Sequence, residues 1–458
     1  MLTKMHLAPK YSDEGIHQML ITFAVKNWRT FKDWATLSMR ASREKTDSEK
    51  SAKLPPKYGT TKILPVAAIY GANASGKSSL MDALALIQRL VVKGNAVTQM
   101  IPVEPFRLDK ESKRTPTSFK MEVLIDELIY VYELSCTRAD VVREKLTIRR
   151  TRTDQLVFIR NGDEIVFGTK FDGERVRLIA ENTRSNQLFL HNAVAQNAEF
   201  FRPLFDWFDK SLTILGTDAE YSRYSQMLLR PDFLNFVNDR LRRYNTGAAQ
   251  IDLAPVAQDS VPVPPGVIEE FVNSVPEGKE ANLQIRFNGS GGSEIFIVRV
   301  YNGESTCSKV KTVHFTDEGE RVIFDLSDES RGTQKLIELL PLFFDLAAEN
   351  ENRTPCERVY LVDEMGGNFH SALTIDLVRK YLECCNENTR NQLIFSTHDF
   401  IFMTEHVLRR DELWVCEKNT AGESTTKCVG NHPGIRADTD LLKNYRAGLF
   451  GGYPIFSD

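Results

Sequence analysis

A glycine-rich stretch near the beginning of the chain has the residue types and spacing of a phosphate-binding loop. Residues 71–78, GANASGKS, fit the pattern G-x-x-x-x-G-K-[ST], whose backbone N–H groups surround the phosphates of a nucleotide. In this pattern Lys77 neutralises the β- and γ-phosphates, and the hydroxyl of Ser78 is a ligand of Mg²⁺. The stretch therefore predicts ATP and Mg²⁺ as cofactors. The candidate nucleotide-binding residues are Gly71, Asn73, Ala74, Ser75, Gly76, Lys77, Ser78 and Ser79.

Two adjacent carboxylates follow an apolar stretch much later in the chain. The four apolar residues of 359–362 predict a buried strand, and Asp363 and Glu364 come directly after it. At the end of such a strand, Asp363 is placed to hold the Mg²⁺ shell through water. Glu364 is placed to act as the general base that polarises the attacking water. In an ordinary loop the same pair would be a solvated surface.

A histidine and a serine–glycine pair are the other candidates for phosphate chemistry. His398 ends a further apolar stretch, LIFSTHD, where it is placed to sense the γ-phosphate and to orient the attacking water. On its own the pattern favours a core or turn histidine, and the presence of the other two motifs reverses this interpretation. Ser330 and Gly332 lie at the start of a predicted helix, where free N–H groups bind anions. In isolation they are a plain helix cap.

These residues require an α/β fold to bring them together. Buried apolar strands alternating with helices predict a parallel or mixed sheet with helices on its faces. Strand-like alternation predicts a hairpin over 19–40 and an antiparallel β layer over 117–180. Residues 186–246 look helical, whereas 252–266 are rich in proline and predict a linker or loop. Pro341 predicts a kink or a break in the helix that follows Gly332.

The order of these segments predicts one nucleotide-binding lobe that is interrupted by a long insertion. We expect a disordered extension over 1–18, an N-terminal lobe with the antiparallel β layer over 19–185, a helical insertion lobe with its linker over 186–280, and a C-terminal lobe over 281–458.

Composition places the chain among ordinary globular proteins and argues against several other classes. Its 458 residues are 42% hydrophobic and 26% charged, and no apolar run is long enough for a membrane span, so we expect a cytoplasmic protein. Seven cysteines without a C-x-x-C pair argue against a disulfide framework or a structural zinc site. A net charge of −4 gives no overall attraction to nucleic acid. The basic clusters at 142–152 and 238–244 are either solvated faces or local nucleic-acid contacts.

Taken in this order, the four motifs resemble those of the ABC ATPases, and the long insertion resembles the branch with the SMC, RecF and OLD proteins. The resemblance implies an ABC ATPase head that forms head-to-tail dimers, in which Ser330 and Gly332 contact the γ-phosphate bound by the partner protomer. The segment 329–334, ESRGTQ, departs from the signature LSGGQ. The segment 366–370 takes the place of the D-loop, and Gln187 and Gln196 are weak candidates for the Q-loop.

The final segment, 440–456, resembles the tails of small defence ATPases, and the chain as a whole resembles the ATPase subunits of two-gene anti-phage systems of the PARIS or AbiL kind. OLD nucleases carry a TOPRIM nuclease domain. Glu417, Asp438 and Asp440 are possible TOPRIM carboxylates, but too few residues surround them for that domain. The resemblance therefore implies a homo-oligomer that controls a separate TOPRIM nuclease effector, with a phage-encoded protein as trigger.

Three other functions remain open on the sequence. A RecF- or SMC-like ATPase of DNA repair or recombination would act on DNA directly, and whether DNA is bound is uncertain. A scaffold that binds ATP only for assembly would hydrolyse almost none of it. A transporter cassette fits least, because the strand-rich insertion does not suit it and no membrane partner is indicated.

Overall fold

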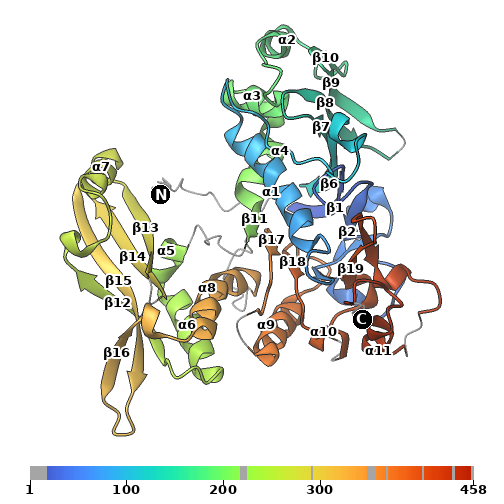
Figure 1. Cartoon of the computed structure of the whole chain (residues 1–458). Coiled ribbons are helices and arrows are strands. Elements are labelled where there is room, and N and C mark those ends of the chain that lie inside the picture. Colours follow the sequence, from blue (N-terminus) through green and yellow to red (C-terminus); the bar gives the residue numbers. More distant parts are fainter. Residues whose placement is uncertain are drawn as a thin grey trace. The chain divides into compact units, whose positions relative to one another are not determined.

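The computed structural model describes residues 18–151, 153–216, 224–289, 292–347, 357–367, 370–404, 407–435 and 439–454 (Figure 1). The expected extension over 1–18 lies outside these residues, except that Gln18 begins the first strand. The chain divides into two compact units. The larger unit comprises 15–219, 352–367 and 378–458, and the smaller unit comprises 1–14, 220–351 and 368–377.

A six-stranded sheet forms the centre of the larger unit. In spatial order its strands are β11 (Leu212–Leu215), β17 (Val359–Val362), β18 (Gln392–Ser396), β5 (Val66–Tyr70), β19 (Leu413–Lys418) and β20 (Ser424–Cys428). The first five strands are parallel and β20 is an antiparallel edge. Every residue of β5, β17 and β18 is buried, as continuous apolar strands of a covered parallel sheet require. The α/β fold is therefore confirmed.

Helices and tail segments cover the two faces of this sheet. Helix α1 (Lys77–Lys93) shares a hydrophobic core with Ala67 and Ile69 of β5. Because side chains alternate along a strand, Tyr70 lies on the opposite face, where its ring meets Tyr445 at 6.1 Å. Tyr445 belongs to helix α11 (Leu441–Arg446), and the short helix α10 (Ile401–Thr404) contacts α11.

A seven-stranded antiparallel sheet is the second layer of the larger unit. In spatial order it contains β10 (Glu164–Phe167), β9 (Gln155–Asn161), β8 (Val141–Arg149), β7 (Leu128–Cys136), β6 (Thr117–Ile125), β1 (Gln18–Lys26) and β2 (Ala35–Ser38). The predicted hairpin and antiparallel layer are confirmed. Three helices follow this sheet along the chain: α2 (Glu174–Glu181), α3 (Phe189–Ala195) and α4 (Arg202–Asp206).

The smaller unit combines helices with a sheet of its own. Its strands are β12 (Gln250–Val256), β13 (Glu280–Gly289), β14 (Gly292–Tyr301), β15 (Glu304–Phe315) and β16 (Arg321–Asp325). Its helices include α5 (Tyr224–Leu228), α6 (Pro231–Arg243), α7 (Val267–Ser274) and α8 (Arg331–Leu346). The insertion that interrupts the larger unit is therefore helical only in part.

Three local expectations differ from the structure. The segment 186–246 is not helical throughout, because its short apolar run 212–215 forms β11, and such a run cannot be told from a buried helix by periodicity alone. The expected loop over 252–266 begins as strand β12, and its Pro255 is tolerated because β12 is an edge strand. Of the kink or break expected at Pro341, the break does not occur, because the helix continues to Leu346.

The junctions between the units also fall elsewhere than the expected lobe boundaries. They lie at 219/220 and 351/352, whereas the lobes were expected to meet at 185/186 and 280/281. Residues 186–219 consequently belong to the larger unit, and the strands over 281–325 belong to the smaller unit.

Candidate nucleotide-binding site

The glycine-rich loop connects the carboxyl end of β5 to the start of α1. Gly71 and Gly76 have φ angles of 149° and 112°, which favour glycine, and Ala74 adopts a left-handed φ of 59°. A side chain at position 71 is excluded, because a Cβ atom there would lie 2.4 Å from the carbonyl oxygen of Cys416. The loop is therefore a tight turn whose backbone, rather than its side chains, forms the surface.

This loop has the properties that a phosphate site needs. Gly76 is the N-cap of α1 and supplies no side-chain hydrogen bond, so the first N–H groups of the helix are free to bind an anion. Asn73, Ala74 and Ser78 are exposed, whereas the buried hydroxyl of Ser75 has no hydrogen-bond partner among the described residues. An orphaned buried hydroxyl beside free amides fits an oxyanion.

Lys77 is buried and points back onto the loop. Its Nζ atom donates to the carbonyl oxygens of Gly71 at 2.8 Å and Ala72 at 3.1 Å. Burial lowers the pKa of Lys77, because removing an ammonium group from water disfavours its charged form. A bound phosphate would compensate this loss of hydration. The side chain can exchange these two carbonyl contacts for phosphate oxygens without leaving the loop.

The two carboxylates follow β17 and are linked to the neighbouring strand β18 by one serine. The hydroxyl of Ser396, the last residue of β18, donates to Asp363 Oδ1 at 2.5 Å. The hydroxyl oxygen of Ser396 in turn accepts the backbone N–H of Glu364 at 2.8 Å. Glu364 is exposed and adopts a left-handed φ of 54°, a conformation that a non-glycine residue holds only at some cost. Ser396 therefore fixes both residues relative to the sheet.

His398 lies on the loop after β18, at the same edge of the sheet. Partial burial of its ring and the positive charge of Lys77 lower the pKa of His398 from its ordinary value of 6.5. The carboxylates of Glu364 and Asp363 act on it in the opposite direction. All four side chains are thus close enough to influence one another, and the imidazole is neutral at neutral pH.

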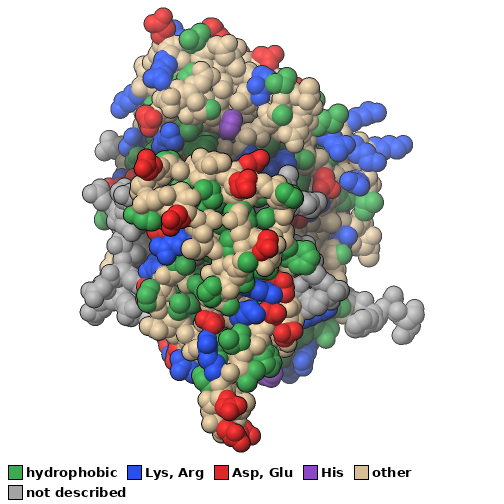
Figure 2. Space-filling model, turned by 90° about the vertical axis from the view of Figure 1, so that its left-hand side faces the viewer, with side chains coloured by type: hydrophobic (Ala, Val, Ile, Leu, Met, Phe, Trp, Pro, Cys, Tyr) green, Lys and Arg blue, Asp and Glu red, His purple; other side chains and the backbone are tan. Residues whose placement is uncertain are grey.

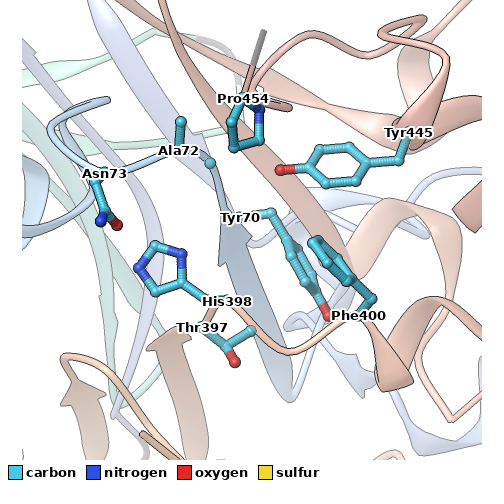
Figure 3. Close-up of a pocket in the computed structure, with 9 residues that line it drawn as sticks. Tyr70, Ala72, Asn73, Thr397, His398, Phe400, Tyr445 and Pro454 are labelled. Carbon is cyan, nitrogen blue, oxygen red and sulfur yellow. The ribbon is translucent and has the colours of Figure 1, made fainter. Parts of the chain in front are cut away.

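A pocket of about 390 Å³ adjoins the loop (Figure 3). Asn73 and His398 lie on one side of it, and an aromatic wall of Tyr70, Phe400 and Tyr445 lies on the other. The pocket is lined by Tyr70, Gly71, Ala72, Asn73, Thr397, His398, Phe400, Tyr445 and Pro454.

The C-terminal tail lies against the base of the phosphate loop. A Cβ atom on Gly452 would lie 2.9 Å from the carbonyl oxygen of Cys416 and 3.4 Å from Cα of Gly71. The hydroxyl of Tyr445 donates to the carbonyl oxygen of Gly452 at 2.9 Å, which holds the tail in place. The tail, β19 and the phosphate loop therefore meet here with no room for a side chain on Gly452.

The turn between β1 and β2 covers the other side of the loop. Trp28 Nε1 donates to the carbonyl oxygen of Ser79 at 2.7 Å, and Arg29 forms an ion pair with Asp82 of α1. A Cβ atom on Gly76 would lie 2.9 Å from the ring of Phe31. Residues 27–31, NWRTF, thus form a wall of the site as well as the turn of the β1–β2 hairpin.

The segment 329–334, which we call the signature segment, belongs to the smaller unit and begins α8. Ser330 is exposed and is the N-cap of this helix, and its hydroxyl accepts the N–H of Thr333 at 3.1 Å. Gly332 lies in the first turn and is half-buried. The exposed helix start has the free N–H groups that an anion requires.

The structure does not bring the Q-loop candidates to the site. They flank α3, whose His191 contacts Val91 O and Gly94 at the far end of α1. That end lies about 24 Å from the phosphate loop, since 16 residues rise about 1.5 Å each. The amide of Gln196 instead donates to Asn192 within the same helix.

The remaining candidates have local structural roles. His370 accepts the N–H of Ala372 at the start of α9 (Ser371–Cys384), while 368 and 369 lie outside the described residues. Glu417 forms an ion pair with Lys427, and Asp440 caps α11 by accepting the N–H of Lys443. Asp438 lies outside the described residues.

No group of three or more His, Cys, Asp or Glu side chains that could hold a metal ion by itself occurs in the described part of the chain. At a nucleotide site Mg²⁺ needs only one or two protein ligands, because phosphates and water supply the rest. The Ser78 hydroxyl and the Asp363 carboxylate fit this role. Within the described ranges no helix has the length and apolarity needed to cross a membrane.

Comparison with known proteins gives a family and distant structural similarities. The profile described as "AAA domain, putative AbiEii toxin, Type IV TA system" matches residues 66–403. Comparison with curated proteins finds no match.

Among solved structures, an SMC head domain from Thermotoga maritima is 13% identical, with a TM-score of 0.34 over 90% of this chain and 99% of that one. An SmcHead bound to the C-winged helix domain of ScpA is 11% identical, with a TM-score of 0.36 over 89% and 97%. The recombination mediator protein RecF with ATP is 12% identical, with a TM-score of 0.29 over 91% and 100%. At such scores the fold assignment rests on the strand order described above.

The family match runs from the first residue of β5 to beyond His398, and so includes the phosphate loop, both carboxylates and the signature segment. The chain therefore belongs to the family of AAA domains described as putative AbiEii toxin, Type IV TA system.

Proposed function

We propose that this protein is an ATP-hydrolysing switch subunit of a bacterial anti-phage defence system, and that it assembles as an oligomer and controls a separate TOPRIM nuclease. The observation that carries the hydrolytic part is the cluster of Lys77, Asp363, Glu364 and His398 at one edge of the sheet, in which Ser396 holds the two carboxylate residues. Such a cluster has a part for binding phosphate and a part for activating water.

Each side chain has a distinct task in this proposal. Lys77 and the amides at the start of α1 bind the phosphates, and Ser78 and Asp363 hold the Mg²⁺ that neutralises the charge developing on them. Glu364 holds the attacking water by accepting its proton, for which its exposed position is suitable. His398, neutral at neutral pH, contacts the γ-phosphate by donating a hydrogen bond.

The assembly part of the proposal rests on the resemblance to ABC ATPases. The phosphate loop lies in the larger unit and the signature segment lies in the smaller unit. In a head-to-tail dimer the exposed start of α8 would meet the phosphate bound by the partner, as the resemblance to ABC ATPases implies. Nucleotide binding would then close the interface, and hydrolysis would open it.

The defence role rests on family analogy. The family's description refers to a putative toxin of a toxin–antitoxin system, and the tail segment 440–456 resembles those of defence ATPases. A phage-encoded protein would be the trigger that releases or activates the nuclease. On the face shown in Figure 2, Lys and Arg side chains are interspersed with Asp and Glu, which gives no support to a DNA-binding role.

The hydrolytic part is tested by Glu364→Gln, with Glu383→Gln on the exposed surface of α9 as the control. We expect Glu364→Gln to bind ATP normally and to turn it over at least about 100-fold more slowly, the usual contribution of a general base. Turnover is measured as phosphate release at saturating ATP and Mg²⁺. Equal turnover in both variants would show that Glu364 is not the base.

The assembly and effector parts are tested by measuring molecular mass in solution for the wild type and Glu364→Gln. We expect a larger species with ATP and Mg²⁺, which captures the product of the neighbouring gene and persists in Glu364→Gln. A protein that stays monomeric, ignores the neighbouring product and responds only to added DNA would favour the RecF-like alternative.

A further inference from the structure

The residue that precedes Ser330 is a buried glutamate in an exposed segment. The side chain of Glu329 is only 5% exposed, whereas Ser330 and Arg331 on either side of the helix start are open to solvent. Burial of a carboxylate is costly unless strong hydrogen bonds compensate it. Its position therefore indicates a specific set of partners rather than a solvated acidic surface.

Those partners lie on strand β15. The hydroxyl of Thr312 donates to Glu329 Oε1 at 2.5 Å, and Nε2 of His314 lies 2.7 Å from the same oxygen. Since a carboxylate oxygen only accepts, His314 is the donor in this contact. Two donors from alternate residues of one strand thus converge on a single oxygen atom.

The main chain of Glu329 is held from the other side. Gln334, one turn into α8, donates its side-chain amide to the carbonyl oxygen of Glu329 at 2.8 Å. Ser330 caps the helix through the N–H of Thr333. Glu329 is consequently the residue through which the start of α8 is attached to the sheet of the smaller unit.

The same strand leads to a projecting hairpin. The ring of His314 stacks on that of Phe324 in β16, with centroids 4.3 Å apart and planes 28° apart. Figure 1 shows the β15–β16 hairpin extending from the sheet, and Figure 2 shows acidic side chains at its turn, residues 317–320. Through its contact with Glu329, His314 therefore joins this hairpin to the signature segment.

We propose that Glu329 is a positioning residue for catalysis in the partner's site: it holds the signature end of α8 against β15 without contacting nucleotide itself. The inference rests on the proposed function, because Ser330 meets a phosphate only in the head-to-tail dimer. A displacement of the helix start by about 1 Å is enough to cost about 100-fold in rate when a group must be aligned with a reacting phosphate.

The first test compares the kinetics of Glu329→Ala, Glu329→Gln and Glu294→Ala. We expect Glu329→Ala to lower kcat about 100-fold and to leave the affinity of the isolated protomer for ATP within about threefold, since positioning affects the rate rather than ground-state binding. Glu329→Gln retains an oxygen that can accept from Thr312 and His314, so it should recover most of kcat. Glu294, which pairs with Lys309 in the same sheet, is the matched control and should behave as the wild type.

The second test asks whether the defect acts in trans. Glu329→Ala retains an intact phosphate loop, and Lys77→Ala retains an intact signature segment. In a head-to-tail dimer, mixing the two inactive variants creates one complete site per mixed dimer, so part of the turnover should return. Absence of recovery, with mixed dimers demonstrated by mass, would overturn the assignment of Glu329 to the partner's site.

The third test does not depend on activity. Hydrogen exchange of the amides of 330–334 should be faster in Glu329→Ala than in Glu294→Ala, because only the former releases the helix start. If the wild type does not hydrolyse ATP, the proposed function fails, while this measurement still decides whether Glu329 holds α8. If the wild type is active and Glu329→Ala equals it in both kcat and exchange, the positioning role is wrong.

Discussion

Ser396→Ala removes one buried hydroxyl that contacts both carboxylate residues of the candidate nucleotide-binding site. The hydroxyl donates to Asp363 Oδ1 at 2.5 Å and accepts the N–H of Glu364 at 2.8 Å. A hydrogen bond to a charged group contributes about 1.5–3 kcal/mol and a neutral one about 1 kcal/mol. Asp363 is half-buried and Glu364 is exposed, so water replaces part of the loss. We therefore expect the free energy of unfolding to fall by about 2 kcal/mol.

The same change should slow ATP turnover. Without the Ser396 hydroxyl, the N–H of Glu364 loses its partner in β18 and only the backbone bond from Met365 N–H to the Ser396 carbonyl oxygen remains, so the candidate base is less often aligned with water. A loss of about 1.4 kcal/mol in alignment corresponds to a tenfold lower kcat. Unfolding is measured in urea, and kcat is measured by phosphate release at saturating ATP.

Ser51→Ala is the matched control for this experiment. Ser51 is fully buried, like Ser396, but its hydroxyl has no hydrogen-bond partner among the described residues. Its removal should change the free energy of unfolding by less than about 0.5 kcal/mol. If Ser396→Ala unfolds at the same urea concentration as Ser51→Ala and keeps the wild-type kcat, the bridging role of Ser396 is refuted.

Two further changes test other parts of the larger unit. Gly452→Ala should lower ATP affinity about tenfold or more, because its Cβ would lie 2.4 Å from Val415 and displace the base of the phosphate loop. The control is Gly434→Ala, since Gly434 has a similar φ of 89° but open space around it. Equal ATP affinities of the two variants in titration would contradict this account. Burial raises the pKa of Glu412 to about 8. The folded state therefore keeps a proton that the unfolded state has lost, and stability should fall by about 1.4 kcal/mol per pH unit from about 4.5 to about 8. Glu412→Gln should abolish this slope in urea unfolding at several pH values, and parallel profiles for the two proteins would show that Glu412 is ionised.

The positions of the candidate site residues in the fold were predictable wherever local patterns carry them. The loop 71–78 follows a buried strand and opens a helix, and Asp363 and Glu364 end another buried strand, so spacing and flanking residues were sufficient. Ser396 lies next to the predicted His398 but was not identified. Its importance depends on β18 lying beside β17, which is a property of strand order rather than of sequence.

The tail was recognised as a motif without a location, and the turn beside the loop was predicted only as part of a hairpin. The glycines at 451 and 452 carry no chemistry of their own, and only their packing on Glu417, Val415 and Gly71 explains them. The prediction of the Q-loop candidates was wrong because glutamine is a common residue, and nothing in the local sequence distinguishes a glutamine that reaches a phosphate. Long-range packing decides both cases.

The sequence by itself determined the α/β class, the phosphate loop, the carboxylate pair and the start of the signature helix, because hydrophobic periodicity and short motifs are local. Tertiary structure decided that Ser396 joins two strands, that the tail backs the phosphate loop, and that Glu329 ties α8 to β15. Each of these contacts joins residues from different elements. Their energies come from burial and hydrogen-bond geometry that exist only after the elements have packed together.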